Sequence, residues 1–415
     1  MSVSGDSTIH RIYLDHAATT ALDSRVLGAM MPYLTTEWHN PSSIYIESQG
    51  TRRSIDLARL KISSIIGSSP DEILFTSGGS ESDNLALRGV LEAKQGAGKH
   101  VITSAGEHHA VLDPLEQLER LGVAEVTRLP LQKDGTVSPT DVENSLRKDT
   151  VLVSIMHANN EVGAINDIAE ISSLVKSYNK SVIVHTDAVQ SMAHIPVTVK
   201  DLDADLITFT AHKMYGPRGA GALYIKSGTP IAGQIIGGGQ ENSLRAGTEN
   251  TAAIVGFASA LEISTEQREQ DLANERKLQK ILFNELPKKI PNLAITGPKK
   301  LDKRLPGHVS CVVGFVEGES ILLALDLAGI AASSGSACTT GAIEPSHVLT
   351  AMGVPQDLAR GSLRLSFGRN SNVDDANKLL VKLPKIIERL RALSPNDMEP
   401  SPDWIEWLHQ SDQEY

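Results

Sequence analysis

A cysteine surrounded by small residues is the first feature of this chain that could do chemistry. Cys338 lies in the segment 333–341, Ser-Ser-Gly-Ser-Ala-Cys-Thr-Thr-Gly, where no bulky side chain shields the sulfur. A thiolate on a flexible loop can attack a substrate and carry the acquired group away. The segment by itself is equally consistent with an exposed cysteine on a surface linker. The only other cysteine, Cys311, lies in an apolar strand-like stretch and is expected to be buried, so no disulfide framework is built.

A lysine and an acid each follow an apolar run that is typical of a buried strand. Lys213 stands in Ala-His-Lys-Met-Tyr-Gly-Pro (211–217), and its amine becomes nucleophilic toward a carbonyl if burial lowers its pKa. Asp187 follows the run 182–184. Because α/β proteins bind ligands beyond the carboxyl ends of their strands, both side chains are candidates for a site there. Capping of a helix explains Asp187 equally well on local grounds.

A glycine-rich turn follows a third apolar run. Gly78-Gly79-Ser80-Glu81 opens a helix after residues 73–76, and the N–H groups at a helix N-terminus favour an anion such as phosphate. An ordinary turn with a serine cap explains the same residues, and the turn matches neither a Walker loop nor the dinucleotide fingerprint. A lysine, a carboxylate and a phosphate-binding turn are together the parts of a pyridoxal phosphate site.

Composition argues against several other functions. A formal net charge of −11 disfavours binding to nucleic acid or to anionic lipid, and no apolar run is long enough to span a membrane. Two cysteines in 415 residues fit a reducing compartment, so we expect a cytoplasmic enzyme. The 13 histidines form no His-Glu-x-x-His motif and no Cys-x-x-Cys is present, so we predict no resting metal site.

Apolar runs alternate with helical patterns over the first part of the chain, which predicts a mostly parallel sheet wrapped by helices. The apolar runs are 73–76, 101–103, 151–155, 182–184 and 206–209. Beyond residue 251 we expect a long helix (252–286), then strands at 309–315 and 363–367 flanked by helices at 319–328 and 374–393. This change predicts an N-terminal arm (1–15) that joins the small domain, a large domain (16–260), a smaller domain (261–395) and an acidic tail (396–415). The tail contains Trp404 and Trp407, and we expect it to pack on the protein itself or to fray, with docking of a partner protein as the alternative.

These motifs resemble the cysteine desulfurases of the NifS/IscS type, from about residue 13 to residue 395. The resemblance is carried by the segments 13–20, 40–43, 81–84, 159–161, 187–191, 212–217, 245–250 and 334–339. It implies an α/β fold, that of the fold type I pyridoxal-phosphate-dependent transferases, with a mostly parallel seven-stranded sheet in the large domain and a smaller α+β C-terminal domain. One segment departs from the family pattern, because residues 237–243 are Gly-Gly-Gly-Gln-Glu-Asn-Ser where the family has Gly-Gly-Gly-His-Glu-Arg-Gly.

The resemblance also implies a role for each candidate residue. Lys213 holds pyridoxal 5'-phosphate covalently, Asp187 pairs with the ring nitrogen, and His108 stacks on the ring and takes part in catalysis. The remaining cofactor-binding residues are Gln190 and Asn160 at the ring, and Gly79, Ser80, Thr210, His212 and Thr248 at the phosphate, with Thr248 reaching over from the second subunit of a homodimer. Arg364 clamps the substrate carboxylate with its bidentate fork, assisted by Asn40.

The implied activity converts L-cysteine to L-alanine and leaves the sulfur as a persulfide on Cys338. The acceptor of the sulfur is an iron–sulfur scaffold or a sulfur-carrier protein, and Cys338 is a candidate for a transient iron–sulfur ligand during transfer. Two alternatives stay open from the sequence. One is a selenocysteine or cystine lyase on the same fold, and the other is a catalytically idle homologue that serves as a scaffold.

Overall fold

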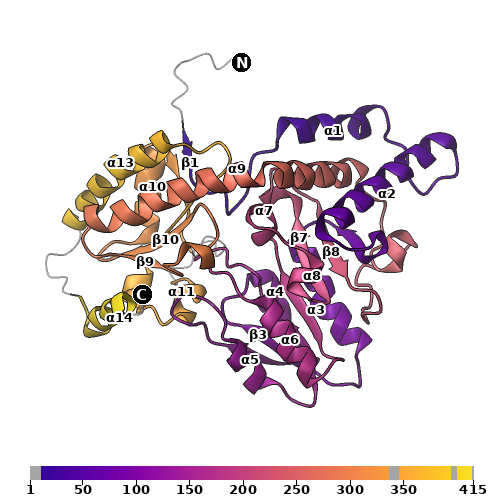
Figure 1. Cartoon of the computed structure of the whole chain (residues 1–415), viewed down its shortest axis with the longest axis horizontal. Coiled ribbons are helices and arrows are strands. Elements are labelled where there is room, and N and C mark those ends of the chain that lie inside the picture. The colour runs from indigo at the N-terminus through magenta and orange to yellow at the C-terminus, as the bar shows by residue number, and fades with distance from the viewer. Residues whose placement is uncertain (1–10, 336–344, 394–399, 414–415) are drawn as a thin grey trace.

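The structure is a computed structural model that describes residues 11–335, 345–393 and 400–413. Cys338 lies outside these ranges. Within them, a central seven-stranded sheet has the order β2-β8-β7-β6-β5-β3-β4, and all neighbours are parallel except at β8, which is antiparallel to β2 and β7 (Figure 1). The strands are β2 (Ile73–Thr76), β3 (His100–Ser104), β4 (Glu125–Leu129), β5 (Thr150–Ser154), β6 (Ile183–Asp187), β7 (Leu206–Thr210) and β8 (Gly221–Ile225). The predicted α/β fold is confirmed.

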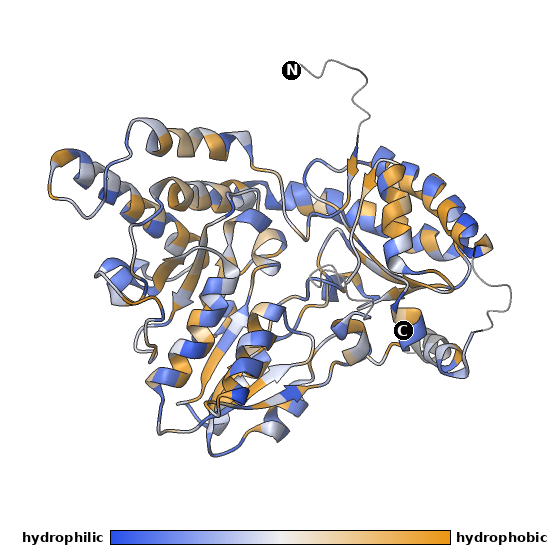
Figure 2. Cartoon of the chain, turned by 180° about the vertical axis from the view of Figure 1, so that it is seen from behind, coloured by the Kyte–Doolittle hydropathy of each residue, from blue (hydrophilic) through white to orange (hydrophobic). Residues whose placement is uncertain are grey.

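Helices cover both faces of this sheet, and each face has its own hydrophobic core. Neighbouring residues of one strand, such as Val101 and Ile102, belong to different cores because successive side chains of a strand point to opposite faces. This burial on both sides explains the continuous apolar runs in the sequence (Figure 2). The helices of this part are α1 (Ser24–Thr35), α2 (Ile46–Ile66), α3 (Gly79–Ala93), α4 (His109–Arg120), α5 (Pro139–Ser145), α6 (Ile168–Tyr178), α7 (Ser191–His194) and α8 (Val199–Leu202).

The C-terminal part is built on an antiparallel sheet of three described strands in the order β12-β10-β9. They are β9 (Leu293–Thr296), β10 (His308–Val313) and β12 (Ser362–Ser366), and the flanking helices are α10 (Gly318–Leu327), α11 (His347–Ala351), α12 (Gln356–Ala359) and α13 (Val373–Ala392). The N-terminal segment joins this part, because β1 (Ile12–Tyr13) pairs in parallel with β11 (Ile330–Ala331). Cys311 on β10 is fully buried, as expected, and burial raises the pKa of its thiol to about 12.

One long helix, α9 (Thr251–Lys289), connects the two parts (Figure 1). Phe257 in its first half belongs to the core of the large sheet, whereas Leu282 in its second half belongs to the core of the small sheet. The predicted boundary at residue 260 therefore falls inside a continuous helix, and the domain limits stay predictions. Among the described residues, no helix is long and apolar enough to cross a membrane.

The tail helix α14 (Pro402–Gln413) packs on the protein through its tryptophans, as predicted. The side chain of Trp404 is 2% exposed, and its ring lies tilted against Phe315 with centroids 4.6 Å apart. Gly314 leaves the space that this ring fills, because a β-carbon there would overlap the indole.

We predict that Trp404→Ala lowers the free energy of unfolding by about 3–5 kcal/mol, because it empties a fully packed aromatic site. Chemical denaturation measures this change. The neighbouring Ile405 is 43% exposed, so Ile405→Ala is the matched control and should change stability by no more than about 0.5 kcal/mol. Equal effects of the two variants would contradict the docking of the tail.

Candidate active site

A cavity of about 460 Å³ opens at the carboxyl ends of the parallel strands. Its walls bring together most of the residues that the sequence singled out. They are Gly79, Ser80, His108, Asn160, Asp187, Gln190, Thr210, His212, Lys213 and Arg364. Ser333 and Gly335, which directly precede the segment with Cys338, line the same cavity.

Helix α3 begins at one end of this cavity with Gly79 and Ser80. A β-carbon at Gly79 would lie 2.9 Å from a methyl carbon of Val189, so the turn packs too closely for a side chain there. Glu81 steadies the turn, since its carboxylate accepts a hydrogen bond from Ser77 N at 2.9 Å. The first N–H groups of this 15-residue helix point toward the cavity end, which makes it an anion site.

Lys213 lines the cavity, and its amine is held by the N-terminal segment. It donates hydrogen bonds to the backbone oxygens of Ala17 and Ala18, both at 2.7 Å. Gln190 donates from Nε2 to the same Ala17 oxygen at 2.9 Å. The segment after β1 therefore holds two of the predicted cofactor-binding side chains in place. Ala17 lies 173 residues before Gln190 and 196 residues before Lys213 in the sequence.

Asp187 ends strand β6 with its carboxylate buried in the cavity wall. Burial raises its pKa to about 6, while the bond from Val189 N at 2.8 Å and the charge of Lys213 act in the opposite direction. The assigned N-cap of α7 is Gln190, which makes no side-chain cap bond, while Asp187 accepts its local bond from Val189 N. Asp187 can thus receive a proton shared with a ring nitrogen.

Two histidines line the cavity as neutral rings. Burial, together with the charge of Lys213, lowers the pKa of both His108 and His212 to about 4. His108 is the N-cap of α4, and its Nδ1 accepts a hydrogen bond from Ala110 N at 3.0 Å. A neutral ring fixed in this way is suited to stacking on a planar ligand.

Arg364 closes the far side of the cavity from strand β12. It is 5% exposed and donates to Asn160 O at 3.0 Å and to Asp15 Oδ1 at 2.8 Å. Its Nε is buried without a hydrogen-bond partner among the described residues. A buried guanidinium with unused donor capacity is the expected receptor for a carboxylate.

The comparisons with known proteins agree with this geometry. The profile of the family described as "Aminotransferase class-V" matches residues 12–379. The chain is 48% identical over 388 residues to "Cysteine desulfurase IscS" of Dictyoglomus turgidum, which covers 94% of this chain and 97% of that protein. It is 45% identical over 384 residues to "Cysteine desulfurase IscS" of Methanosarcina thermophila, which covers 92% and 94%.

Solved structures give the same result. A structure titled "NIFS-LIKE PROTEIN" superimposes with a TM-score of 0.86 at 36% identity and covers 92% of this chain and all 100% of its own. A NifS-like protein from Rickettsia africae superimposes with a TM-score of 0.81 at 33% identity and covers 91% and 100%. The chain belongs to the class V aminotransferase family.

The cavity fits pyridoxal phosphate, the cofactor of this family, in its donor set. Lys213 supplies an amine for the aldehyde, Asp187 a carboxylate for the pyridine nitrogen, and the N-terminus of α3 an anion site for the phosphate. Among the described residues, no group of three His, Cys, Asp or Glu side chains is arranged to hold a metal ion.

Asn40 and Thr248 do not line the cavity of this single chain. Both are exposed, and Asn40 uses its side-chain oxygen to accept a hydrogen bond from Ser42 N at 2.9 Å. Their predicted roles stay predictions, as does that of Cys338. The segment 237–243, which departs from the family pattern, does not line the cavity either. Its Glu241 forms an ion pair with Arg59 of α2 at 2.5 Å.

Sequence reasoning missed one acid in the cavity wall. Asp83 is 1% exposed, and its Oδ1 has no hydrogen-bond partner among the described residues, although His185 Nε2 lies 3.6 Å away. Burial and the charge of Asp187 raise the pKa of Asp83 well above its ordinary value. Its spacing offered a signal, because residues four apart lie on one face of a helix and Asp83 follows Gly79 by that spacing.

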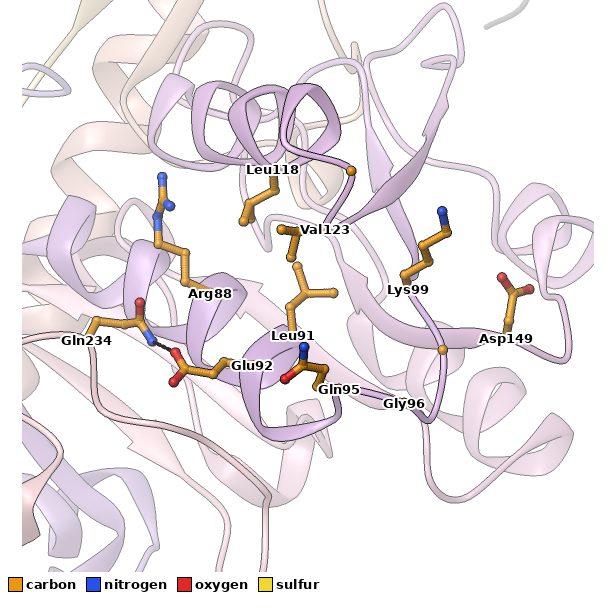
Figure 3. A pocket seen from close by; sticks show the side chains of 12 residues that line it. Arg88, Leu91, Glu92, Gln95, Gly96, Lys99, Leu118, Val123, Asp149 and Gln234 are labelled. Carbon is orange, nitrogen blue, oxygen red and sulfur yellow. Dashed lines mark hydrogen bonds between the residues drawn. The ribbon is translucent and has the colours of Figure 1, made fainter.

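A larger hollow of about 690 Å³ lies at the other end of α3 (Figure 3). Gln234 points at Glu92 there and donates a hydrogen bond to it at 2.9 Å. Lys99 and Asp149 form ion pairs with neighbouring side chains at 2.8 and 2.6 Å. Because these charges already have partners and no predicted site residue lines this hollow, we assign the active site to the smaller cavity.

A second acid, Glu107, is buried directly beside His108. Its Oε1 accepts from Ser104 Oγ at 2.6 Å and from Met156 N at 3.0 Å, whereas its Oε2 has no partner among the described residues. Burial raises the pKa of Glu107 from 4.5 to about 8. Between these two values the unfolded chain releases a proton that the folded chain keeps, so stability falls as the pH rises.

We predict that Glu107→Gln removes part of this loss of stability, because an amide imitates the protonated carboxyl. Between pH 4.5 and pH 8 the free energy of unfolding of the variant should fall less than that of the original chain, by about 4 kcal/mol. Urea unfolding at several pH values measures this. Glu116→Gln, at an exposed position, should leave the pH dependence unchanged, and an unchanged slope for Glu107→Gln would contradict the buried protonated acid.

Proposed function

We propose that this chain is a cysteine desulfurase, which converts L-cysteine to L-alanine and transfers the sulfur through a persulfide on Cys338. The observation that carries this proposal is the content of one cavity. The amine of Lys213, the acid of Asp187 and the fork of Arg364 meet there with Ser333 and Gly335, the residues that lead into the segment of the nucleophile.

The residues divide the reaction between them. Pyridoxal phosphate, when bound, supplies an electron sink that stabilises negative charge on the substrate carbon. Arg364 would bind the carboxylate of L-cysteine, and the amine of Lys213 in the same cavity would move the α-proton. Neutral His108, which lines the same cavity, would stack on the ring of the cofactor.

The nucleophile of the transfer step is the thiolate of Cys338. It attacks the sulfur of the substrate, so that a sulfur–sulfur bond forms while the carbon–sulfur bond breaks and its electron pair stays on the carbon fragment. Protonation of that fragment gives alanine, and the persulfide remains on Cys338. An iron–sulfur scaffold or a sulfur-carrier protein then accepts the sulfur, with Cys338 as a transient ligand if iron is present. We also propose a cytoplasmic location, because two cysteines without a disulfide framework suit a reducing compartment.

We predict that Cys338→Ser abolishes persulfide and sulfide formation from L-cysteine but keeps the absorbance of the bound cofactor. Alanine release and intact mass, which detects one added sulfur atom, measure the reaction together. Cys311→Ser is the matched control and should keep the activity, because that thiol is buried in β10.

Three outcomes would contradict parts of this proposal. Sulfide formation by Cys338→Ser would show that another group is the nucleophile. Turnover of selenocysteine or cystine without turnover of cysteine would favour a lyase. Failure of the original chain to bind pyridoxal phosphate would favour the idle scaffold.

The same site requires a homodimer in our proposal, because Thr248 and Asn40 lie outside the cavity of their own chain. Large apolar side chains are exposed on α1, on α2, in the loop between these helices and in the loop after β8 at residues 235–236, and we propose that they form one apolar surface. Its most exposed members are Trp38 (70%), Ile44 (92%), Ile46 (81%) and Ile236 (79%). Exposed apolar patches of this kind mark protein–protein interfaces, and a twofold interface would place one copy's Thr248 near the other's cavity.

We predict that Ile46→Asp produces a monomer, because a charge would be buried at the centre of this apolar surface. Light scattering coupled to size-exclusion chromatography measures the mass. Leu327→Asp on α10 is the matched control, since Leu327 is 90% exposed but lies on the small domain. A dimer that survives Ile46→Asp would place the interface elsewhere.

A further inference from the structure

Glu161 is a buried acid beside the cavity for which the mechanism above has no use. It is 4% exposed and directly follows Asn160, whose backbone oxygen binds Arg364. Burial raises the pKa of Glu161 to about 7, against the hydrogen bond from Ser346 and the charge of Arg364. A buried carboxyl group lowers the stability of the fold unless hydrogen bonds compensate for its lost hydration, so the contacts of Glu161 indicate its role.

The carboxylate of Glu161 contacts the chain on both sides of the segment 336–344. On the C-terminal side, Ser346 donates its hydroxyl hydrogen bond to Glu161 Oε2. On the N-terminal side, Gly335 packs on the same oxygen so closely that a β-carbon would overlap it. That β-carbon would also lie 3.0 Å from Ser346 Cβ, so the two ends of the segment meet at one carboxylate oxygen.

The two ends are further attached to the substrate side of the cavity. Ser333 exchanges backbone hydrogen bonds with Arg364, at 2.7 Å from Arg364 N to Ser333 O and at 3.2 Å in return. Ser346 is also the N-cap of α11, where its Oγ accepts from Leu349 N at 3.2 Å. The ends are therefore fixed relative to the guanidinium that binds the substrate carboxylate.

Glu161 itself is held by both sheets. Its N–H donates to Asn159 Oδ1 at 2.8 Å in the loop after β5, and its backbone oxygen receives His308 Nε2 of β10 at 2.9 Å. Two residues on, Gly163 O accepts from Leu305 N at 2.8 Å. The backbone of Glu161 is thus hydrogen-bonded both within the loop after β5 and to the small sheet, and a positioning side chain requires such a fixed backbone.

We infer that Glu161 is a positioning residue for sulfur transfer: its carboxylate joins Gly335 to Ser346 and so fixes the two described ends of the Cys338 segment next to Arg364. This inference rests on the proposed desulfurase function, because only that function assigns sulfur transfer to Cys338. Glu161 does not touch the reacting atoms. Its removal should therefore slow the transfer step while leaving cofactor and cysteine binding in place.

The test compares Glu161→Ala, Glu161→Gln and Ser346→Ala with the original holoenzyme. In Glu161→Ala we expect kcat for alanine formation to fall about tenfold or more, since misplacement of a reacting group by an ångström has effects of this size. KM for L-cysteine and the absorbance change that cysteine induces should stay near their original values. Glu161→Gln should recover part of kcat, because its amide oxygen can still accept from Ser346.

The second readout needs no turnover. Alkylation of the holoenzyme by iodoacetamide without substrate should be several-fold faster at Cys338 in Glu161→Ala and in Ser346→Ala, while Cys311, being fully buried, stays unmodified. The matched control is Glu275→Gln, which changes another buried acid, one that pairs with His194 at 3.0 Å. It should leave the alkylation rate unchanged.

The outcomes separate this inference from the proposed function. If Glu161→Ala and Glu161→Gln match Glu275→Gln in both kcat and alkylation rate, the positioning role is wrong. If the original chain forms no alanine and no persulfide, the proposed function fails, while the alkylation rates still decide whether Glu161 joins the two ends. Should Glu161→Ala fail to fold, Glu161→Gln and Ser346→Ala carry the comparison.

Discussion

The burial of Arg364 is the interaction on which the rest of the site depends. A guanidinium cannot lose its charge at accessible pH. A buried guanidinium therefore requires hydrogen-bond acceptors or a negative charge from the surrounding chain. Here Asp15 comes from the N-terminal segment and the Asn160 oxygen from the loop after β5, while Arg364 itself lies on β12. One side chain thereby draws the arm, the large sheet and the small sheet together, and the cavity lies where they meet.

Burial in that cavity explains the protonation of its side chains. Burial favours the uncharged form of every ionisable group, which keeps His108 and His212 neutral and raises the pKa of Asp187. Lys213 is the charge that acts on all three, lowering the pKa of each. A ligand with a phosphate would bring negative charge near Lys213, and its pyridine nitrogen would share a proton with Asp187. This agrees with the pyridoxal-phosphate-dependent family to which the chain belongs.

Patterns along the chain predicted most elements, and the exceptions have physical causes. The central strands were predictable because burial on both faces demands an unbroken apolar run, as in β5. The edge strand β4 is partly exposed and mixes Glu125 and Arg128 with apolar residues, so it has no such run. The boundary at residue 260 fell inside α9 because a helix that changes partners halfway shows no break in its own pattern.

The sequence by itself determined the identity of the reactive groups and the elements that carry them. Asp187 ends a strand, Gly79 begins a helix and Lys213 lies in the short turn after β7, and such local positions are encoded by neighbouring residues. Only the tertiary structure decided which groups are buried and paired. Glu107 beside His108 and Glu161, which contacts both ends of the Cys338 segment, give no local signal of their environment. Their contacts join residues up to 185 positions apart, and burial of a charge depends on everything packed around it rather than on its neighbours in sequence.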